Sequence, residues 1–192
     1  MLKQLTTIAL LTGTTLLFAG CGSMLSSLEM DTITDEPVER TMAQQFEDES
    51  IETKAEVNIH AADDAFDNAH LAIVSYNGYV LLAGQVGDEA LKAKATEVVR
   101  KIHGVRRIYN ELQIASPSSA MTRSSDTWIT AKVKTWLLGR SDTEGMRVKV
   151  LTENGVVYLM GLVTRAEAER ISDEAAGISG VQRVVQLFEL VG

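Results

Sequence analysis

The side chain with the most reactive chemistry belongs to Cys21, the single cysteine of this 192-residue chain. A lone thiol forms no internal disulfide and has no second thiol with which to bind zinc. It follows residues 1–20, in which one early lysine precedes an uncharged apolar run. That pattern is typical of a secretory signal peptide. A cysteine at this boundary has no folded core to enter, so a buried structural role is the weaker alternative.

The segment that ends at this cysteine, Leu17-Phe18-Ala19-Gly20-Cys21, resembles the lipobox of bacterial lipoproteins. In that motif the signal peptide is cleaved before a cysteine that then receives lipid. Phe18 is a departure, because leucine is usual three residues before the cysteine. Gly22 stands where an aspartate would retain a lipoprotein at the inner membrane. The resemblance therefore implies acylation (palmitate) at Cys21 and a lipid-anchored protein on the periplasmic face of the outer membrane.

A second group of residues with binding chemistry lies on the segment Ser125–Gly139, which predicts an amphipathic helix. Ser125 and Asp126 supply N-cap chemistry, and Gly139 supplies a stop. At about 100° per residue, one stripe faces a core: Ile129, Val133, Trp136 and Leu137. The opposite side, which is normally polar, carries Trp128, Ala131, Lys134, Thr135 and Leu138. Tryptophan and leucine beside a lysine on the outer side indicate a docking surface.

Each of these residues also has a simpler interpretation. Trp136 lies in the core stripe, so packing against a sheet is favoured, and a membrane-facing role stays open. Trp128 lies roughly 130° from the centre of that stripe, where burial is less natural. Packing of Trp128 against the other half of the chain is the alternative, since interfaces favour tryptophan. Lys134 by itself would be an ordinary solvated charge.

The chain contains an internal repeat. Asn77-Gly78 matches Asn154-Gly155, Gly84 matches Gly161, and Gly104-Val105 matches Gly180-Val181. Ile51, Ala55 and Ile59 precede Ile129, Val133 and Leu137 by 78 positions, and the offset later falls to 77 and 76. Asn-Gly between alternating apolar runs is a strong hairpin signal. Each repeat therefore predicts the order helix, strand, strand, helix, strand.

These elements predict an α+β fold of two αββαβ modules, each with a three-stranded mixed sheet covered by two helices. The predicted strands are 71–76, 79–84 and 106–114, then 148–153, 156–161 and 182–190. The intervening helices are 88–103 and 165–179. The predicted domain order is signal peptide 1–20, lipidated cysteine and flexible tether 21–47, first domain 48–114, linker 115–124 and second domain 125–192.

This repeat pattern resembles the BON domain, present twice. The resemblance rests on the segments 126–133, 152–164 and 179–181, covers essentially all of the chain after the signal peptide, and is strongest in the second repeat. An asparagine of the family's third strand is present as Asn110 but is Gln186 in the second repeat, so we assume no shared role there.

The resemblance implies that the first helix of the second BON domain binds anionic phospholipids such as phosphatidylglycerol and cardiolipin. Trp128 matches the inserting tryptophan, Lys134 the basic position and Leu138 the apolar position at the end of the helix. No cofactor is implied. Within the family, such a lipoprotein would support envelope integrity and gather at the division septum. The alternative is a periplasmic protein-interaction adaptor for the outer-membrane protein assembly machinery.

Charge supports the lipid interpretation. Residues 22–114 hold eight basic and 17 acidic residues, whereas residues 115–192 hold nine of each. In the first repeat, the positions of Trp128, Ala131, Lys134, Thr135 and Leu138 are occupied by Ser50, Thr53, Glu56, Val57 and His60. With Glu47, Asp48, Glu49 and Glu52 nearby, the outward face of the first helix is predicted to be acidic and repelled by an anionic bilayer.

Catalysis and metal binding find no support in the sequence. It contains no Gly-x-Ser-x-Gly motif, phosphate loop or Cys/His pair, and His60, His70 and His103 share no ligand spacing. The overall charge of −8 argues against nucleic acid as a partner. We expect a protein without enzymatic activity whose weak bilayer contact is aided by the tether, which spans roughly 28 Å if flexible.

Overall fold

Each repeat is built on a β-hairpin with an Asn-Gly turn. In a computed structural model, which describes residues 41–139 and 147–192, φ is 51° at Asn77 and 50° at Asn154. The glycines that follow, Gly78 and Gly155, both have φ of 74°. Positive φ at both central positions defines the type I′ turn that joins twisted strands tightly. The predictions for Cys21 and for the signal peptide lie outside the described residues.

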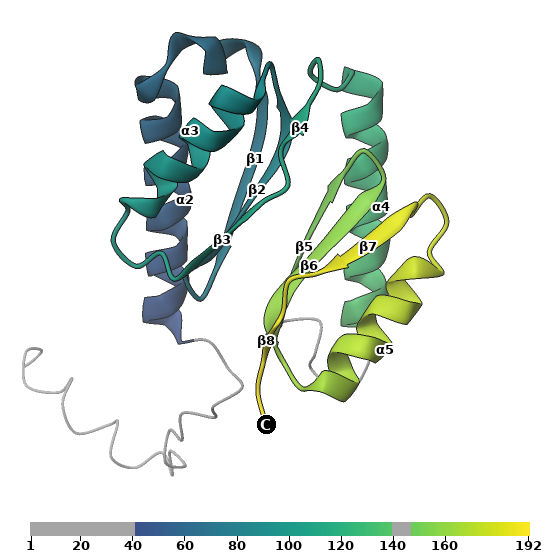
Figure 1. The fold of residues 1–192 in the computed structure, drawn as a ribbon. Helices are drawn as coiled ribbons and strands as arrows, with labels where there is room; N and C mark the ends of the chain where they lie inside the picture. The colour runs from purple at the N-terminus through teal and green to yellow at the C-terminus, as the bar shows by residue number, and fades with distance from the viewer. Residues whose placement is uncertain (1–40, 140–146) are drawn as a thin grey trace, which may run out of the picture. The chain divides into compact units, whose positions relative to one another are not determined.

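The element order is the same in both repeats (Figure 1). The first repeat contains α2 (Met42–Ala62), the 3-10 helix η1 (Asp64–Asn68), β1 (His70–Tyr76), β2 (Tyr79–Val86), α3 (Glu89–Arg100), β3 (Arg107–Asn110) and β4 (Gln113–Ile114). The second contains α4 (Ala120–Leu138), β5 (Val148–Glu153), β6 (Val156–Val163), α5 (Arg165–Ala176), β7 (Arg183–Gln186) and β8 (Glu189–Leu190). In each, the central strand pairs antiparallel with the first strand and parallel with the third. The predicted α+β fold with mixed sheets is confirmed.

The third strand of each repeat is split, whereas the sequence predicted one continuous strand. β3 and β4 both pair with β2, and β7 and β8 both pair with β6. At the break in the first repeat, the Asn110 side chain donates to the Lys92 carbonyl at 2.8 Å and to Thr96 Oγ1 at 2.6 Å. Its Oδ1 accepts a hydrogen bond from the Leu112 amide at 3.2 Å. These bonds tie the interrupted strand to α3, a tertiary contact that strand periodicity does not reveal.

Both first helices begin earlier than predicted. α4 starts at Ala120 with Ser119 as its N-cap, so five residues of the predicted linker 115–124 are helical. α2 starts at Met42 with a capping box of Thr41 and Gln44, so the end of the predicted tether is helical as well. In both cases a serine or threonine upstream of the apolar pattern caps the helix, and an additional turn or more precedes the first core residue.

Asp126 is not the N-cap of α4 but a buried residue within it, 5% exposed. Its carboxylate accepts hydrogen bonds from the backbone amides of Asn154 and Gly155, both at 2.9 Å. Asp48, at the equivalent position of α2 and 1% exposed, accepts from the amides of Asn77 and Gly78 at 2.8 and 2.9 Å. Each first helix is therefore joined to the hairpin turn of its own repeat by a buried aspartate.

The helices of each repeat cover one face of its sheet and enclose a core. In the first repeat that core includes Ile51, Ala55 and Ile59 of α2 with Leu91, Ala95 and Val99 of α3. In the second it includes Ile129, Val133 and Leu137 of α4 with Ala168, Ile171 and Ala175 of α5. The inward residues that helical periodicity predicted for the first helices are confirmed.

The other faces of the two sheets pack against each other, and both repeats belong to one compact unit. A third cluster joins the repeats through Tyr76, Leu81, Ala83, Val156, Tyr158, Met160 and Leu187. β2 and β6 are consequently buried on both faces, which explains their nearly uninterrupted apolar sequences. Burial in this cluster raises the pKa of Tyr158 to about 12, with the nearby carboxylate of Glu111 adding to the increase.

Polar contacts surround this apolar cluster. Glu153, 6% exposed, accepts a hydrogen bond from Gln85 Nε2 at 2.9 Å and lies 3.1 Å from His70 Nε2. Lys149 donates to Glu52 at 2.7 Å, and Arg106 forms a two-pronged pair with Glu189 at 2.8 and 3.0 Å. Burial alone raises the pKa of Glu189, but hydrogen bonds from Arg106 and Asn77 outweigh it and hold the pKa below its usual value.

The buried aspartate predicts a stability difference. Asp126→Ala leaves two buried backbone amides without an acceptor and should lower the free energy of unfolding by about 2 kcal/mol. Asp126→Asn, which keeps one acceptor oxygen, should cost less. Urea titration followed by circular dichroism measures both variants, and equal stability of Asp126→Ala and the parent chain would contradict the assignment.

The pair between Arg106 and Glu189 predicts a pH dependence. Because folding lowers the pKa of Glu189, its contribution is present above the unfolded pKa and is lost as the pH falls through the folded value. Glu189→Gln should therefore lower stability by at most about 1 kcal/mol at pH 7, given partial exposure. The difference between parent and variant should shrink toward pH 3. A difference that stays constant across that range argues against the pair.

Candidate functional site

The outer face of α4 exposes large apolar side chains. Trp128 is 69% exposed and Leu138 is 62% exposed, and Ala131, Lys134 and Thr135 are exposed with them. The structure therefore places all five predicted residues on solvent-accessible helix surface. The alternative in which Trp128 packs against the first repeat is wrong, since most of the indole surface remains accessible.

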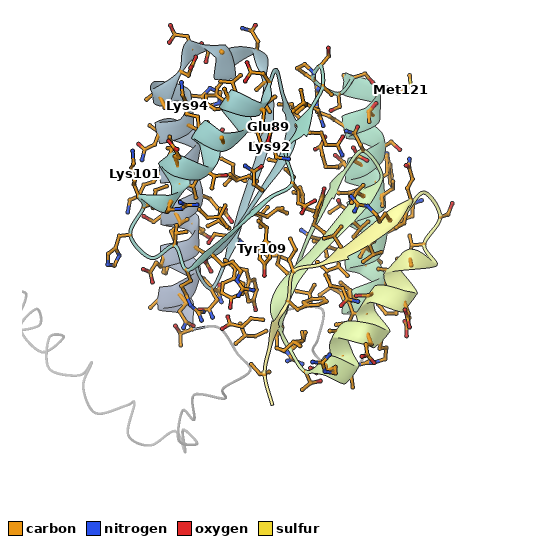
Figure 2. The ribbon with its side chains drawn as sticks, in the orientation of Figure 1. Glu89, Lys92, Lys94, Lys101, Tyr109 and Met121 are labelled. Carbon is orange, nitrogen blue, oxygen red and sulfur yellow. The ribbon has the colours of Figure 1, made fainter. Side chains whose placement is uncertain are left out.

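Met121 extends the same face, and the sequence analysis missed it. It is 83% exposed and lies seven residues before Trp128, two helical turns away on the same side. Figure 2 shows Met121 at the N-terminal part of α4, directed away from the sheet. The residue was overlooked because it falls in the predicted linker. Recognition of Ser119 as the N-cap would have extended the predicted helix to include Met121. We call Met121, Trp128, Ala131, Thr135 and Leu138 the apolar stripe.

Basic residues flank the apolar stripe. On a helical projection Lys132 lies about 40° to one side of Trp128, and Lys134 and Arg123 lie about 120° to 140° to the other. The Lys132 ammonium donates to the Ser179 carbonyl at 2.7 Å, and the Arg123 guanidinium donates to the Ser118 carbonyl. Asp126, the acidic residue of α4, is turned inward. The outer face of α4 therefore carries positive charge unopposed by any acidic residue of the same helix.

The inner face of α4 is committed to the core. Ile129, Val133 and Leu137 are buried, and Trp136 is partly buried against the same cluster. The interpretation of Trp136 as a core residue is confirmed. The two tryptophans of α4 thus lie in contrasting environments, one against the sheet and one toward solvent.

The corresponding face of α2 is different, and part of its prediction is wrong. Asp48 is buried and Glu52 pairs with Lys149 of the second repeat, so neither belongs to the acidic outward face. Glu47, Glu49 and Glu56 are exposed, as predicted. Three large apolar residues also lie on the surface of α2, with exposures of 61% to 71%: Met42, Phe46 and Val57. What separates the two helices is therefore charge more than apolar content.

A metal-binding cluster and a membrane-spanning helix are both absent from the parts of the chain that the structure describes. No group of three or more histidine, cysteine, aspartate or glutamate side chains is arranged to hold a metal within residues 41–139 and 147–192. Within the same ranges, no helix combines the length and apolarity needed to cross a bilayer. The outer face of α4 offers apolar area and positive charge, which suits adsorption to a surface.

Comparison with known proteins gives one family match and several relatives. The model of the BON domain family matches residues 47–116 and 125–192. The chain is 34% identical over 191 residues to the outer membrane lipoprotein DolP of Haemophilus influenzae, which covers 98% of this chain and 97% of the relative. It is 33% identical over 152 residues to a 21 kDa hemolysin of Actinobacillus pleuropneumoniae, covering 79% and 78%. Osmotically-inducible protein Y of Escherichia coli K12 is 29% identical over 124 residues, covering 63% and 62%.

The environments of the two tryptophans predict that their replacement by alanine affects the free energy of unfolding to very different extents. Trp128→Ala removes a side chain that is 69% exposed and should change the free energy of unfolding by less than about 0.5 kcal/mol. Trp136→Ala opens space beside the core of the second repeat and should cost about 3 kcal/mol. Urea titration of the two variants measures this contrast. A large loss of stability in Trp128→Ala would mean that the indole is packed.

Proposed function

This chain belongs to the BON domain family, and on that premise we propose that it is an outer-membrane lipoprotein that binds anionic phospholipids through the outer face of α4. The name of its Haemophilus influenzae relative, an outer membrane lipoprotein aligned over 98% of this chain, supports the membrane location. The lipobox-like sequence before Cys21 supports attachment by lipid on the periplasmic face.

The exposure of Trp128 beside basic residues is the observation that carries this proposal. An indole that is 69% exposed between Met121 and Leu138 is costly to leave in water and well suited to the boundary between headgroups and acyl chains. Lys132 on one edge of the apolar stripe and Lys134 on the other lie where they would meet phosphates as the indole enters. The helix would lie along the bilayer surface.

The expected energy of this contact is modest. Insertion of Trp128 and Leu138 contributes a few kcal/mol at about 25 cal/mol per Å² of apolar area. Each basic residue near an anionic surface adds about 1 kcal/mol. Such a contact is weak for a free protein, but an acylated Cys21 would hold the domain near the bilayer at high effective concentration. The anchor would set the compartment, and α4 would select anionic regions within it.

The first repeat would not serve this role. Its helix α2 exposes Met42, Phe46 and Val57 but surrounds them with Glu47, Glu49 and Glu56, whose charge an anionic surface repels. These exposed apolar residues favour a second candidate function for α2. They would bind a protein partner, as in a periplasmic adaptor for outer-membrane protein assembly. In either case, support of envelope integrity at the division septum is the cellular role we propose.

Replacement of the exposed indole tests the proposal. Trp128→Glu should leave the fold intact and abolish binding to vesicles of phosphatidylglycerol or cardiolipin, because a carboxylate is repelled and does not insert. Val57→Glu places the same charge on an exposed site of α2 and serves as the matched control, which should bind as the parent chain does. Vesicle flotation of the full chain carrying Cys21→Ser, which cannot be acylated, measures binding through the protein surface alone, and circular dichroism checks folding.

Either of two results rejects the lipid site. The first is vesicle binding by Trp128→Glu at the level of the parent chain. The second is a loss of binding in Val57→Glu that equals the loss in Trp128→Glu, which would place the contact outside α4.

A further inference from the structure

A pocket beside the apolar stripe has a counterpart in the first repeat, and the two have diverged. In the second repeat, Ser125 and Ile129 of α4, the Asn154-Gly155 turn, Gly180 and Gln182 line an open pocket of about 500 Å³. In the first repeat, Glu47, Asn77, Gly78, Gly104 and Arg106 occupy the equivalent positions and leave only about 90 Å³. The same backbone frame therefore encloses a filled site in one repeat and an open site in the other.

The polar side chains of the filled site are engaged. Arg106 pairs with Glu189 and donates to the Asn77 carbonyl, and the Asn77 amide side chain donates to Glu189 at 2.7 Å. Glu47 faces the His103 imidazole at 3.9 Å. This site in the first repeat is committed to contacts within the protein.

The polar side chains of the open site are available. The side-chain hydroxyl of Ser125 and the side-chain amide groups of Asn154 and Gln182 have no hydrogen-bond partner within residues 41–139 and 147–192. Only the main-chain N–H groups of Asn154 and Gln182 are bonded, to Asp126 and to the Gly155 carbonyl. Together the three side chains offer both donors and acceptors toward one space.

The charge of the open site limits what it would bind. Its one charged side chain is Asp126, and both oxygens of that carboxylate already accept backbone N–H groups. No lysine or arginine lines the pocket, so it offers no ion pair to a phosphate. Hydroxyl and amide groups over the apolar base of Ile129 suit a neutral group with several hydroxyls, which both donates and accepts hydrogen bonds.

We propose that this pocket binds an uncharged polyol. For its lipid source, the inference rests on the proposed function. Met121 connects the two sites, since it lines the pocket and belongs to the apolar stripe. A phospholipid at the stripe would place its headgroup at the mouth of the pocket. The terminal glycerol of phosphatidylglycerol has the required vicinal hydroxyls, and a soluble sugar is the other source of the same chemistry.

The pocket would let the protein distinguish between two anionic lipids of equal net charge, which electrostatic attraction alone does not. Vesicles of phosphatidylglycerol and of phosphatidylserine carry the same net charge per lipid, but serine presents an ammonium and a carboxylate in place of two hydroxyls. The full chain carrying Cys21→Ser, which cannot be acylated, should bind phosphatidylglycerol vesicles about tenfold more tightly, the effect of one or two hydrogen bonds. The double variant Ser125→Glu with Gln182→Arg restores the residue types of the first repeat without changing net charge, and it should bind both vesicles equally.

A matched control places the same two charges elsewhere. Thr53→Glu with Asn58→Arg alters two exposed positions of α2 and should keep the preference of the parent chain. Equal binding of both vesicles by the parent chain, or a preference that survives filling of the pocket, overturns the polyol inference. If either of these results occurs while Trp128→Glu still abolishes vesicle binding, the proposed function stands and the polyol inference alone fails.

Soluble ligands identify the source of the polyol. In nuclear magnetic resonance titrations of the full chain, glycerophosphoglycerol should shift the side-chain amide signals of Asn154 and Gln182, and glycerophosphoserine should not. Shifts with trehalose alone would support the pocket and assign it to a soluble sugar. Shifts with none of these polyols, or equal shifts with glycerophosphoserine, would overturn the proposal.

Discussion

The inward carboxylate of Asp126 fixes the rotation of α4, and the character of the exposed surface follows from it. Because this side chain accepts both backbone amides of the Asn154-Gly155 turn, the helix has one favourable rotation about its axis. Two residues later, about 200° around the helix, Trp128 must point away from the sheet. The exposed indole is thus a consequence of a buried hydrogen bond as well as of the apolar residues on the inner side.

The first repeat has the same contact between a buried aspartate of its first helix and its Asn-Gly turn. Comparison of the two repeats therefore separates the features that they share from those in which they differ. Asp48 holds the Asn77-Gly78 turn as Asp126 holds its own turn, so the frame of helix and hairpin is common to both repeats. The residues that project from this frame are not. α2 carries exposed carboxylates around its apolar residues, and α4 carries lysine and arginine. A common scaffold therefore carries opposite charge on the exposed faces of its two first helices, and the proposed lipid binding by α4 alone depends on this difference.

Packing of the two sheets against each other explains why the outer faces of the helices are left for binding. The inner faces of both sheets are occupied by the cluster around Tyr76, Leu81, Tyr158 and Met160. Polar pairs such as Lys149 with Glu52 fix how the sheets meet, and removal of one partner would leave a partly buried charge. With the sheets covered on both sides, the surfaces left open for the proposed binding are the outer faces of the helices and the pocket at the hairpin turn of the second repeat.

The sequence by itself determined the duplication, the two Asn-Gly hairpins and the inward residues of the helices; it favoured the contrast between Trp128 and Trp136, which the structure then decided. These are local properties, because turn chemistry and helical periodicity depend on residues that lie close together in the sequence. Only the tertiary structure decided that Asp48 and Glu52 turn inward, that Met121 belongs to the exposed face, and that the third strands are split. Each of these depends on a partner 18 or more residues away, or on a helix cap that precedes the apolar pattern. The nearly continuous apolar sequences of β2 and β6 fit burial on both faces, but the sequence predicted only the face covered by helices, and the second covering surface required the fold.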